Sequence, residues 1–220
     1  PTGTVVGGAG GFLCTTKFDV TYQGKGAHAG EEPHKGKNAL LAAATAALNL
    51  HAIAPHSEGL TRLNVGVLQA GEGRNVIAPR AFLKVETRGE TNDIADYVYR
   101  RAERVIRSAA EMYDLEWNIK KMGEAVTSAS DESLMELVSR VASRMEEVKE
   151  VKRIVDMTGS DDATWMMNRV QRRGGSATYM VIGSDIAAGH HNDHFDFDEN
   201  SMLVALKLLE GTLREIAGFQ

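Results

Sequence analysis

Three histidines stand within five residues near the end of the chain, in the segment GHHNDHFDFDE at 189–199. Imidazole nitrogens bind divalent metal ions, but a catalytic metal usually needs at least three protein ligands. His190, His191 and His194 cannot easily bind one ion together, because neighbouring side chains on an extended backbone point in opposite directions. The segment therefore predicts one metal ligand, or two at most, and the other ligands must come from elsewhere.

The acidic residues of this segment allow two interpretations. A carboxylate can accept a hydrogen bond from the ring of a metal-bound histidine and so fix its orientation. An acidic residue can also cap the following helix, which would make the segment an ordinary polar surface loop. The residues concerned are Asp193, Asp196, Asp198 and Glu199. Outside this segment the chain has no H-x-D or H-E-x-x-H pattern and no paired cysteines, so alone it cannot complete a metal site.

Two further loops place polar side chains among small residues. His28 lies in GKGAHAGEEPHKG at 24–36, where glycine and alanine let the backbone approach a ligand closely. Arg74 and Asn75 lie in AGEGRNVIAP, just before an apolar run. The alternative for each loop is a simple connection with exposed side chains, and the residues alone leave both interpretations open.

Hydrophobic periodicity predicts the elements that position these loops. Alternation of apolar and polar residues indicates strands, and apolar residues three or four positions apart indicate helices. Strands are expected at 12–22, 63–67, 81–85 and 115–119, with helices at 38–53 and 94–112. This order of strand, helix, strand, strand, helix, strand is typical of a ferredoxin-like fold, an antiparallel sheet covered by two helices. We place this β-α-β-β-α-β domain at 12–121.

The helices make testable predictions about individual residues. Asn38 is expected to cap the first helix. The second helix is expected to bury one stripe, formed by Ile94, Val98, Ala102, Val105, Ala109 and Met112. The last helix of the chain is expected to have one apolar face, formed by Met202, Leu206, Leu209, Leu213 and Ile216.

The rest of the chain predicts part of a layered α/β domain at 122–220. A helix at 133–148, a strand at 151–156 and a buried strand at 176–184 precede the histidine segment and the last helix. The first residues, PTGTVVGGAGGF, are rich in glycine and predict a connection. The fold class is therefore α/β with an α+β ferredoxin-like domain.

Composition excludes several classes of protein. A hydrophobic content of 43% and a charged content of 25% are those of an ordinary globular protein. The net charge of −5 argues against a nucleic-acid partner, and no apolar run is long enough to span a membrane. The single cysteine, Cys14, excludes an intrachain disulfide and is expected in a reducing compartment such as the cytoplasm. The chain begins at Pro1 without an initiator methionine, and we expect a fragment of a longer protein.

Four segments together resemble a known family. They are GKGAHAGEEPH at 24–34, GEGRNVIAPRAFLKVETR at 71–88, TGSDD at 158–162 and HHNDHFDFDE at 190–199. In this order and spacing they resemble the metal-dependent amidohydrolases and carboxypeptidases that include aminoacylases, carboxypeptidase G and indole-acetyl-amino-acid hydrolases. The resemblance implies a catalytic α/β domain with two divalent metal ions (zinc or manganese), interrupted by a ferredoxin-like lid that dimerises. Residues 1–11 would then end the first catalytic segment, 12–121 would be the lid, and 122–220 would be the last catalytic segment.

The resemblance also implies roles for individual residues. In the family pattern His-x-x-x-aromatic-x-apolar-x-Glu, the metal ligand falls on His191, and the other ligands and the catalytic glutamate are expected upstream of Pro1. The metal site is therefore incomplete in this chain. His28 resembles the lid histidine that enters the active site of the partner and stabilises the oxyanion. Asn75 and Arg88 resemble lid residues that hold the substrate carboxylate or the reacting oxygens. Gly159 and Ser160 are expected to line the substrate pocket.

The activity implied is hydrolysis of the amide bond of N-acyl amino acids, with p-aminobenzoyl-glutamate the leading candidate. A metal-activated water would attack the carbonyl carbon. The expected partners are the small-molecule substrate and a second copy bound through the lid, and the resemblance leaves open whether a second related subunit is also required. The isolated chain is expected to have little activity. Departures such as HAGEEPH and GSDD leave the substrate preference open. The alternative is a non-enzymatic ferredoxin-like dimerisation or metal-binding module.

Overall fold

The computed structural model describes residues 1–190 and 192–218, which form two compact units. Residues 13–127 and 160–162 form the first, which we call the ferredoxin-like unit. Residues 1–12, 128–159 and 163–220 form the second, which we call the three-stranded unit. None of the described helices has the length and apolarity needed to cross a membrane.

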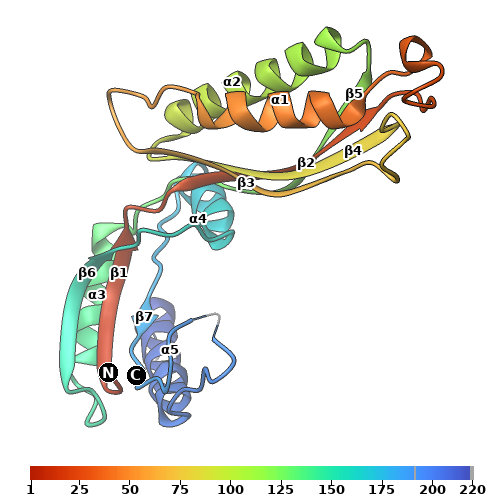
Figure 1. Ribbon diagram of the computed structural model, residues 1–220. Helices are drawn as coiled ribbons and strands as arrows, with labels where there is room; N and C mark the ends of the chain where they lie inside the picture. The colour runs from red at the N-terminus through yellow and green to blue at the C-terminus, as the bar shows by residue number, and fades with distance from the viewer. Residues whose placement is uncertain (191, 219–220) are drawn as a thin grey trace. The chain divides into compact units, whose positions relative to one another are not determined.

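The ferredoxin-like unit has the predicted order of elements. These are β2 (Cys14–Gln23), α1 (Ala39–His51), β3 (Thr61–Ala70), β4 (Arg80–Gly89), α2 (Asn92–Met112) and β5 (Glu116–Ala125). The strands form one antiparallel sheet in the order β3-β4-β2-β5, and both helices cover the same face of it (Figure 1). The predicted fold class is thereby confirmed.

Alternation along the strands separates a core from an open face. In β2, Phe18, Val20 and Tyr22 are buried beneath the helices, whereas Lys17 and Thr21 are exposed on the other side. We call this uncovered side of the sheet the open face. The first helix begins as predicted, because the side chain of Asn38 accepts hydrogen bonds from the backbone N–H groups of Leu40 and Leu41.

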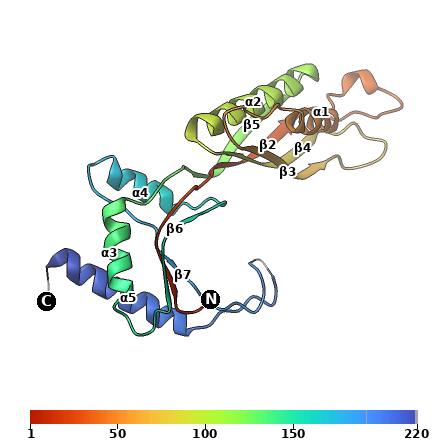
Figure 2. The same cartoon turned by 90° about the vertical axis from the view of Figure 1, so that its left-hand side faces the viewer.

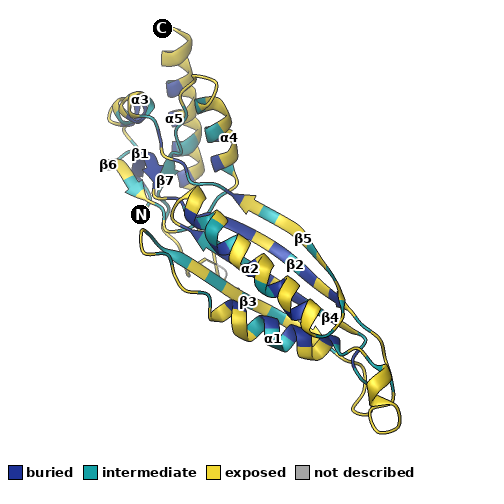
Figure 3. Ribbon diagram, turned by 90° about the horizontal axis from the view of Figure 1, so that it is seen from above, coloured by how far each residue is buried: buried dark blue, intermediate teal, exposed yellow. Residues whose placement is uncertain are grey.

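The buried stripe of α2 differs from the prediction at its end. Ile94, Val98, Ala102 and Ala109 are buried as expected. Figure 3 shows both buried and exposed positions along α2. Ile106 is fully buried where Val105 was predicted, and Met112 is 66% exposed. The buried residues continue in steps of four from Ala102 to Ile106, whereas the predicted stripe stepped by three to Val105. Met112 lies on the same side of α2 as Ile94, five turns later, but it is the last residue of the helix and is not covered there.

The three-stranded unit is built around a parallel pair of strands. Its central strand β1 (Thr4–Gly10) pairs in parallel with β6 (Glu150–Asp156) and antiparallel with β7 (Val181–Ile182). The described part of this unit also contains α3 (Glu132–Ala142), α4 (Ala163–Gln171) and α5 (Asn200–Ala217) (Figure 2). The helix predicted at 133–148 ends at Ala142, and the strand predicted at 176–184 forms ladder pairs only at Val181 and Ile182.

The prediction of a connection at the start of the chain is wrong, because every residue of β1 is buried. Its glycines let α3 lie directly against the strand. A Cβ atom added at Gly8 would lie 2.4 Å from Met135 Cγ, and one added at Gly7 would lie 2.6 Å from Ser139 Oγ. These glycines therefore mark a close approach of helix and strand rather than a flexible segment.

Gly8→Ala is expected to lower the free energy of unfolding by about 1–3 kcal/mol, because the added methyl group must displace Met135 in a packed core. Urea denaturation of the 220-residue chain measures this effect. Gly10→Ala is the matched control on the same strand, since its Cβ would meet no atom closer than 3.8 Å. Equal stability of the Gly8 and Gly10 variants would contradict this account of the packing.

The predicted apolar face of α5 is largely exposed. Its residues, Met202, Leu206, Leu209, Leu213 and Ile216, are between 45% and 64% exposed. The buried positions of α5 are Ser201, Val204, Leu208 and Thr212, and this less apolar side packs in a cluster with Val138 and Val141 of α3. The sequence pattern identifies the more hydrophobic side of a helix, but the neighbouring elements decide which side is covered.

Candidate functional site

His28 lies on a loop that is tied to the neighbouring loop by backbone hydrogen bonds. Ala29 N–H donates to the Asn75 carbonyl at 2.9 Å, and Ile77 N–H donates to the Ala27 carbonyl at 3.0 Å. His28 and Val76 form the bridge between the two loops. The loop starts at Gly24, where a Cβ atom would lie 2.2 Å from the Lys37 carbonyl oxygen. The structure thus brings the predicted residues His28 and Asn75 onto one paired segment, with both side chains exposed.

The backbone around His28 selects one form of its ring. Nδ1 accepts hydrogen bonds from the N–H groups of Gly30, at 3.2 Å, and Glu31, at 3.1 Å. A neutral imidazole that accepts at Nδ1 carries its proton at Nε2. His28 is therefore held with a hydrogen-bond donor on the ring nitrogen that the loop does not use. Such a donor can stabilise negative charge on a ligand oxygen.

Arg88 lies on the open face of β4 and is held by an acidic neighbour. Its Nε donates to Oε2 of Glu86 at 3.0 Å, and its Nη2 donates to Oε1 at 3.2 Å. The hydroxyl of Thr15 on β2 donates to the same Oε1 at 3.2 Å. The side chains of Arg88 and Glu86 are only 33% and 28% exposed. Partial burial reduces the screening of this ion pair by solvent.

A cavity of about 390 Å³ adjoins Arg88 within the ferredoxin-like unit. Lys17, Glu86 and Ser160 also line it, together with Thr15, Met122, Gly123, Glu124, Ala125, Asp161 and Asp162. The hydroxyl oxygen of Ser160 is buried and has no hydrogen-bond partner in the described part of the chain. A buried oxygen without a partner is costly, and a bound ligand would satisfy it. Gly159, the other predicted pocket residue, belongs to the three-stranded unit.

His28 and Arg88 lie at opposite ends of the same sheet. The His28 loop adjoins the start of β4, because Gly24 N–H donates to the carbonyl of Pro79, whereas Arg88 lies near the end of β4 opposite Thr15. A strand rises about 3.3 Å per residue, so Arg80 and Arg88 are separated by roughly 26 Å. One copy of the chain therefore cannot place both side chains on one small ligand.

His191, the predicted metal ligand, lies outside the described residues. Near it, the ring of His190 stacks on Phe195 with 5.3 Å between ring centroids. Asp198 accepts a hydrogen bond from Asn200 N–H at the start of α5, and chiefly for this reason its pKa is held below the usual value. This contact supports the helix-capping interpretation for Asp198. The described residues contain no group of three or more His, Cys, Asp or Glu side chains that could hold a metal ion.

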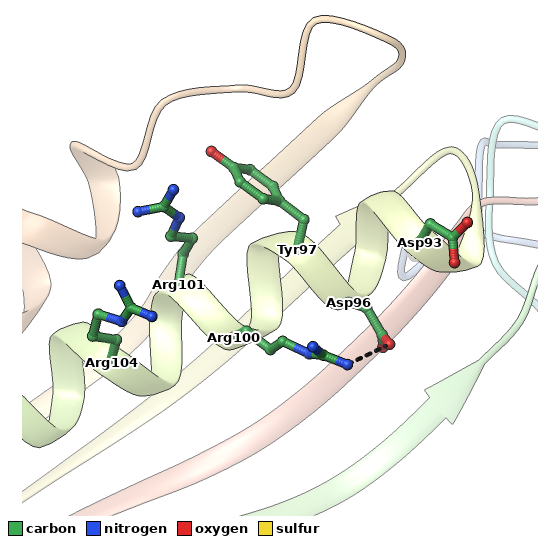
Figure 4. A pocket seen from close by; sticks show the side chains of 6 residues that line it. All are labelled: Asp93, Asp96, Tyr97, Arg100, Arg101 and Arg104. Carbon is green, nitrogen blue, oxygen red and sulfur yellow. Dashed lines mark ion pairs between the residues drawn. The ribbon is translucent and has the colours of Figure 1, made fainter.

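A second cavity of about 420 Å³ lies on the outer side of α2 (Figure 4). The guanidinium of Arg101 lies 5.3 Å from the centroid of the Tyr97 ring, and Arg100 pairs with Asp96 at 3.5 Å. Arg104 completes this lining together with Asp93. The arginines lie on the solvent side of an amphipathic helix, which is where charged residues are expected. We assign no role to this cavity.

Sequence reasoning missed the residues that surround Arg88. Glu86 is two positions before it on the same strand, and Lys17 faces Glu86 in the β2–β4 register. The alternation that identified β4 also places residues 86 and 88 on one face, so Glu86 could have been found from the period of two. Lys17 and Thr15 required the register between two strands, which no local pattern contains.

Comparisons with known proteins identify relatives of this chain. Residues 15–114 match the M20 peptidase dimerisation domain. The chain is 53% identical to indole-3-acetyl-aspartic acid hydrolase of Enterobacter agglomerans over 210 residues, which are 95% of this chain and 48% of that protein. It is 49% identical to the A-type subunit of p-aminobenzoyl-glutamate hydrolase of Escherichia coli over 213 residues, which are 96% of this chain and 49% of that protein.

A solved structure is similar over the same length. The crystal structure of an aminobenzoyl-glutamate utilization protein from Klebsiella pneumoniae matches with a TM-score of 0.86 and 46% sequence identity, over 96% of this chain and 51% of that one. The chain thus spans about half the length of the relatives it matches. With the ferredoxin-like unit, the dimerisation-domain match and these relatives, the chain belongs to the M20 family of metal-dependent amidohydrolases and peptidases.

Proposed function

We propose that this chain supplies the dimerising lid and the last catalytic segment of a hydrolase that cleaves the amide bond of N-acyl amino acids. Because the relatives are about twice as long, the activity is assigned to the full-length gene product and not to these 220 residues. The observation that carries the proposal is the fixed Nε2–H donor of His28, which suits an oxyanion formed at an amide carbonyl. Asn75, on the paired loop, would assist it.

The amino-acid part of the substrate would bind at the Arg88 cavity. A guanidinium binds a carboxylate through two parallel hydrogen bonds, and Ser160 offers a further hydroxyl. Lys17 also lines this cavity and forms no ion pair among residues 1–190 and 192–218. Two cationic side chains favour an amino acid with a second carboxylate, as in p-aminobenzoyl-glutamate. The names of the two relatives, which mention aspartic acid and glutamate conjugates, support this choice.

The described residues contain no group of three or more His, Cys, Asp or Glu side chains that could hold a metal ion. We propose that His191 and ligands outside this chain hold two divalent ions, zinc or manganese, which would activate the attacking water when bound. The single buried cysteine, Cys14, supports a cytoplasmic location.

Dimerisation through the lid would bring the two ends of the sheet together. β3 is an edge strand with one charged residue, Arg62, whereas the other edge, β5, carries Glu116, Lys120, Lys121 and Glu124. Charges on an edge strand discourage pairing, so β3 is the edge available to a second copy. Antiparallel pairing of two β3 strands about a two-fold axis would place the His28 end of one sheet beside the Arg88 end of the other.

Exposed leucines beside this edge fit the same interface. Leu41 and Leu48 of α1 are 44% and 76% exposed, and Leu68 of β3 is 42% exposed. We therefore propose a homodimer in which each active site combines Arg88 of one copy with His28 of the other. The name of the Escherichia coli relative marks it as one component of a larger hydrolase, which supports a second, related protein as a further partner.

The test of the proposed function is hydrolysis by the full-length gene product. We expect cleavage of p-aminobenzoyl-glutamate and of indole-3-acetyl-aspartate, loss of activity after treatment with a chelator, and its return with Zn²⁺ or Mn²⁺. The 220-residue chain is the matched control and is expected to show little turnover. If the purified full-length protein cleaves no member of a panel of N-acyl amino acids, a non-enzymatic dimerisation module is the better assignment.

A further inference from the structure

We propose that Glu86 is a positioning residue, which holds the guanidinium of Arg88 in the orientation that binds the substrate carboxylate. This inference rests on the proposed function of Arg88. Its basis is the two-point contact in which Nε and Nη2 of Arg88 donate to the two oxygens of Glu86, at 3.0 and 3.2 Å. The Thr15 hydroxyl on the neighbouring strand lies 3.2 Å from Oε1 of the same carboxylate and 3.3 Å from the Thr87 carbonyl oxygen, so it can donate to Glu86 from β2.

The contact determines which part of the guanidinium remains available. A guanidinium has five N–H donors in one plane. Glu86 occupies the edge formed by Nε and Nη2, and the edge formed by Nη1 and Nη2 is left for a second carboxylate. That edge can again donate two parallel hydrogen bonds. Without Glu86, the long side chain of Arg88 would sample several rotamers, and binding would have to order it at a cost in entropy.

The sheet register argues against a purely structural pair. Lys17 lies directly opposite Glu86 across the β2–β4 ladder, and opposite charges at such positions usually pair to stabilise a sheet. Glu86 instead contacts Arg88 on its own strand, and Lys17 forms no ion pair among the described residues. Lys17, Glu86 and Arg88 all line the same cavity as the buried hydroxyl of Ser160. The Glu86 carboxylate therefore contacts Arg88 at the edge of this cavity and does not pair with Lys17 across the two strands.

The test is a double-mutant cycle in the full-length protein, with p-aminobenzoyl-glutamate as the substrate. Glu86→Gln keeps the size of the side chain but removes its charge and one acceptor oxygen. We expect KM to rise about 10-fold with kcat changed less than about 3-fold. The reason is that the substrate carboxylate would be bound more weakly in the ground state and in the transition state by the same amount. Arg88→Ala should raise KM at least as much, and adding Glu86→Gln to it should have no further effect.

A spectroscopic measurement on the 220-residue chain tests the contact independently of activity. The Nε–H proton of Arg88 should give a distinct, slowly exchanging NMR signal that Glu86→Gln removes. Asp19→Asn is the matched control, because Asp19 lies on the same open face of β2 but does not line the Arg88 cavity. It should leave KM and the Arg88 signal unchanged.

The outcomes separate the two levels of the proposal. If Arg88→Ala leaves KM unchanged, the proposed role of Arg88 is wrong, and the role of Glu86 is overturned with it. A second outcome is that Arg88→Ala raises KM while the double variant shows a further rise equal to that caused by Glu86→Gln alone. In that case Arg88 binds substrate, and only the positioning role of Glu86 is overturned. An Arg88 Nε–H signal that persists in Glu86→Gln would likewise overturn it.

Discussion

Replacing His28 by alanine in the full-length protein is expected to lower kcat by about 100- to 1000-fold, with a smaller change in KM. The structure holds Nδ1 of His28 on two backbone N–H groups, so that Nε2 is a preset donor for the developing oxyanion. Alanine removes this donor without changing the loop contacts made by Ala29 and Ile77. Steady-state kinetics with p-aminobenzoyl-glutamate measure the effect. His34→Ala is the control on the same loop, since His34 is exposed in the short helix Pro33–Lys35, and it should change kcat less than about 3-fold.

Mixing two impaired variants, assayed at substrate concentrations well below KM, tests whether His28 acts on the partner's site. The His28 loop adjoins the start of β4, and Arg88 lies roughly 26 Å along that strand from Arg80, so a shared site must take the two residues from different copies. In a hybrid dimer of His28→Ala and Arg88→Ala, one site loses both residues and the other retains both. Unfolding and refolding an equal mixture should therefore recover about a quarter of the wild-type activity. Recovery of no activity, with hybrid dimers shown to be present, would place both residues in the same chain's site and contradict the proposed dimer.

Leu48→Glu is expected to convert the dimer into a monomer and to lower activity about as much as His28→Ala does. Leu48 is 76% exposed on α1, so a charge there should not disturb the fold, but it would be buried in the proposed interface beside β3. Once the copies separate, His28 no longer reaches a site that contains Arg88. Light scattering with size-exclusion chromatography reports the mass, and kinetics report the loss of turnover.

Met112→Glu provides the matched control for this substitution. Met112 is 66% exposed at the end of α2 in the same unit, so it resembles Leu48 in exposure but lies outside the proposed interface. This variant should remain dimeric and active. A Leu48→Glu protein that stays dimeric at micromolar concentration, or that is monomeric with full activity, would show that α1 does not form the functional interface.

The sequence by itself determined the ferredoxin-like fold and the segments that belong to the candidate site. Strand and helix periods are local properties, so the order of elements in the first unit and the cap at Asn38 could be predicted. The family could be recognised from four short segments, because their sequences and their order in the chain can be read without any knowledge of the packing. The roles of His28, Asn75, Arg88, Gly159, Ser160 and His191 remain predictions.

The tertiary structure alone decided how these residues are oriented and what surrounds them. β1 is buried because α3 covers it, and α5 exposes its most apolar side because α3 packs on the other one. The contact from Thr15 of β2 to Glu86 of β4 depends on the register between these two strands. The distance between His28 and Arg88 follows from the antiparallel pairing of whole strands. Each of these facts depends on residues far apart in the chain, and local periodicity contains no information about which distant segments will meet.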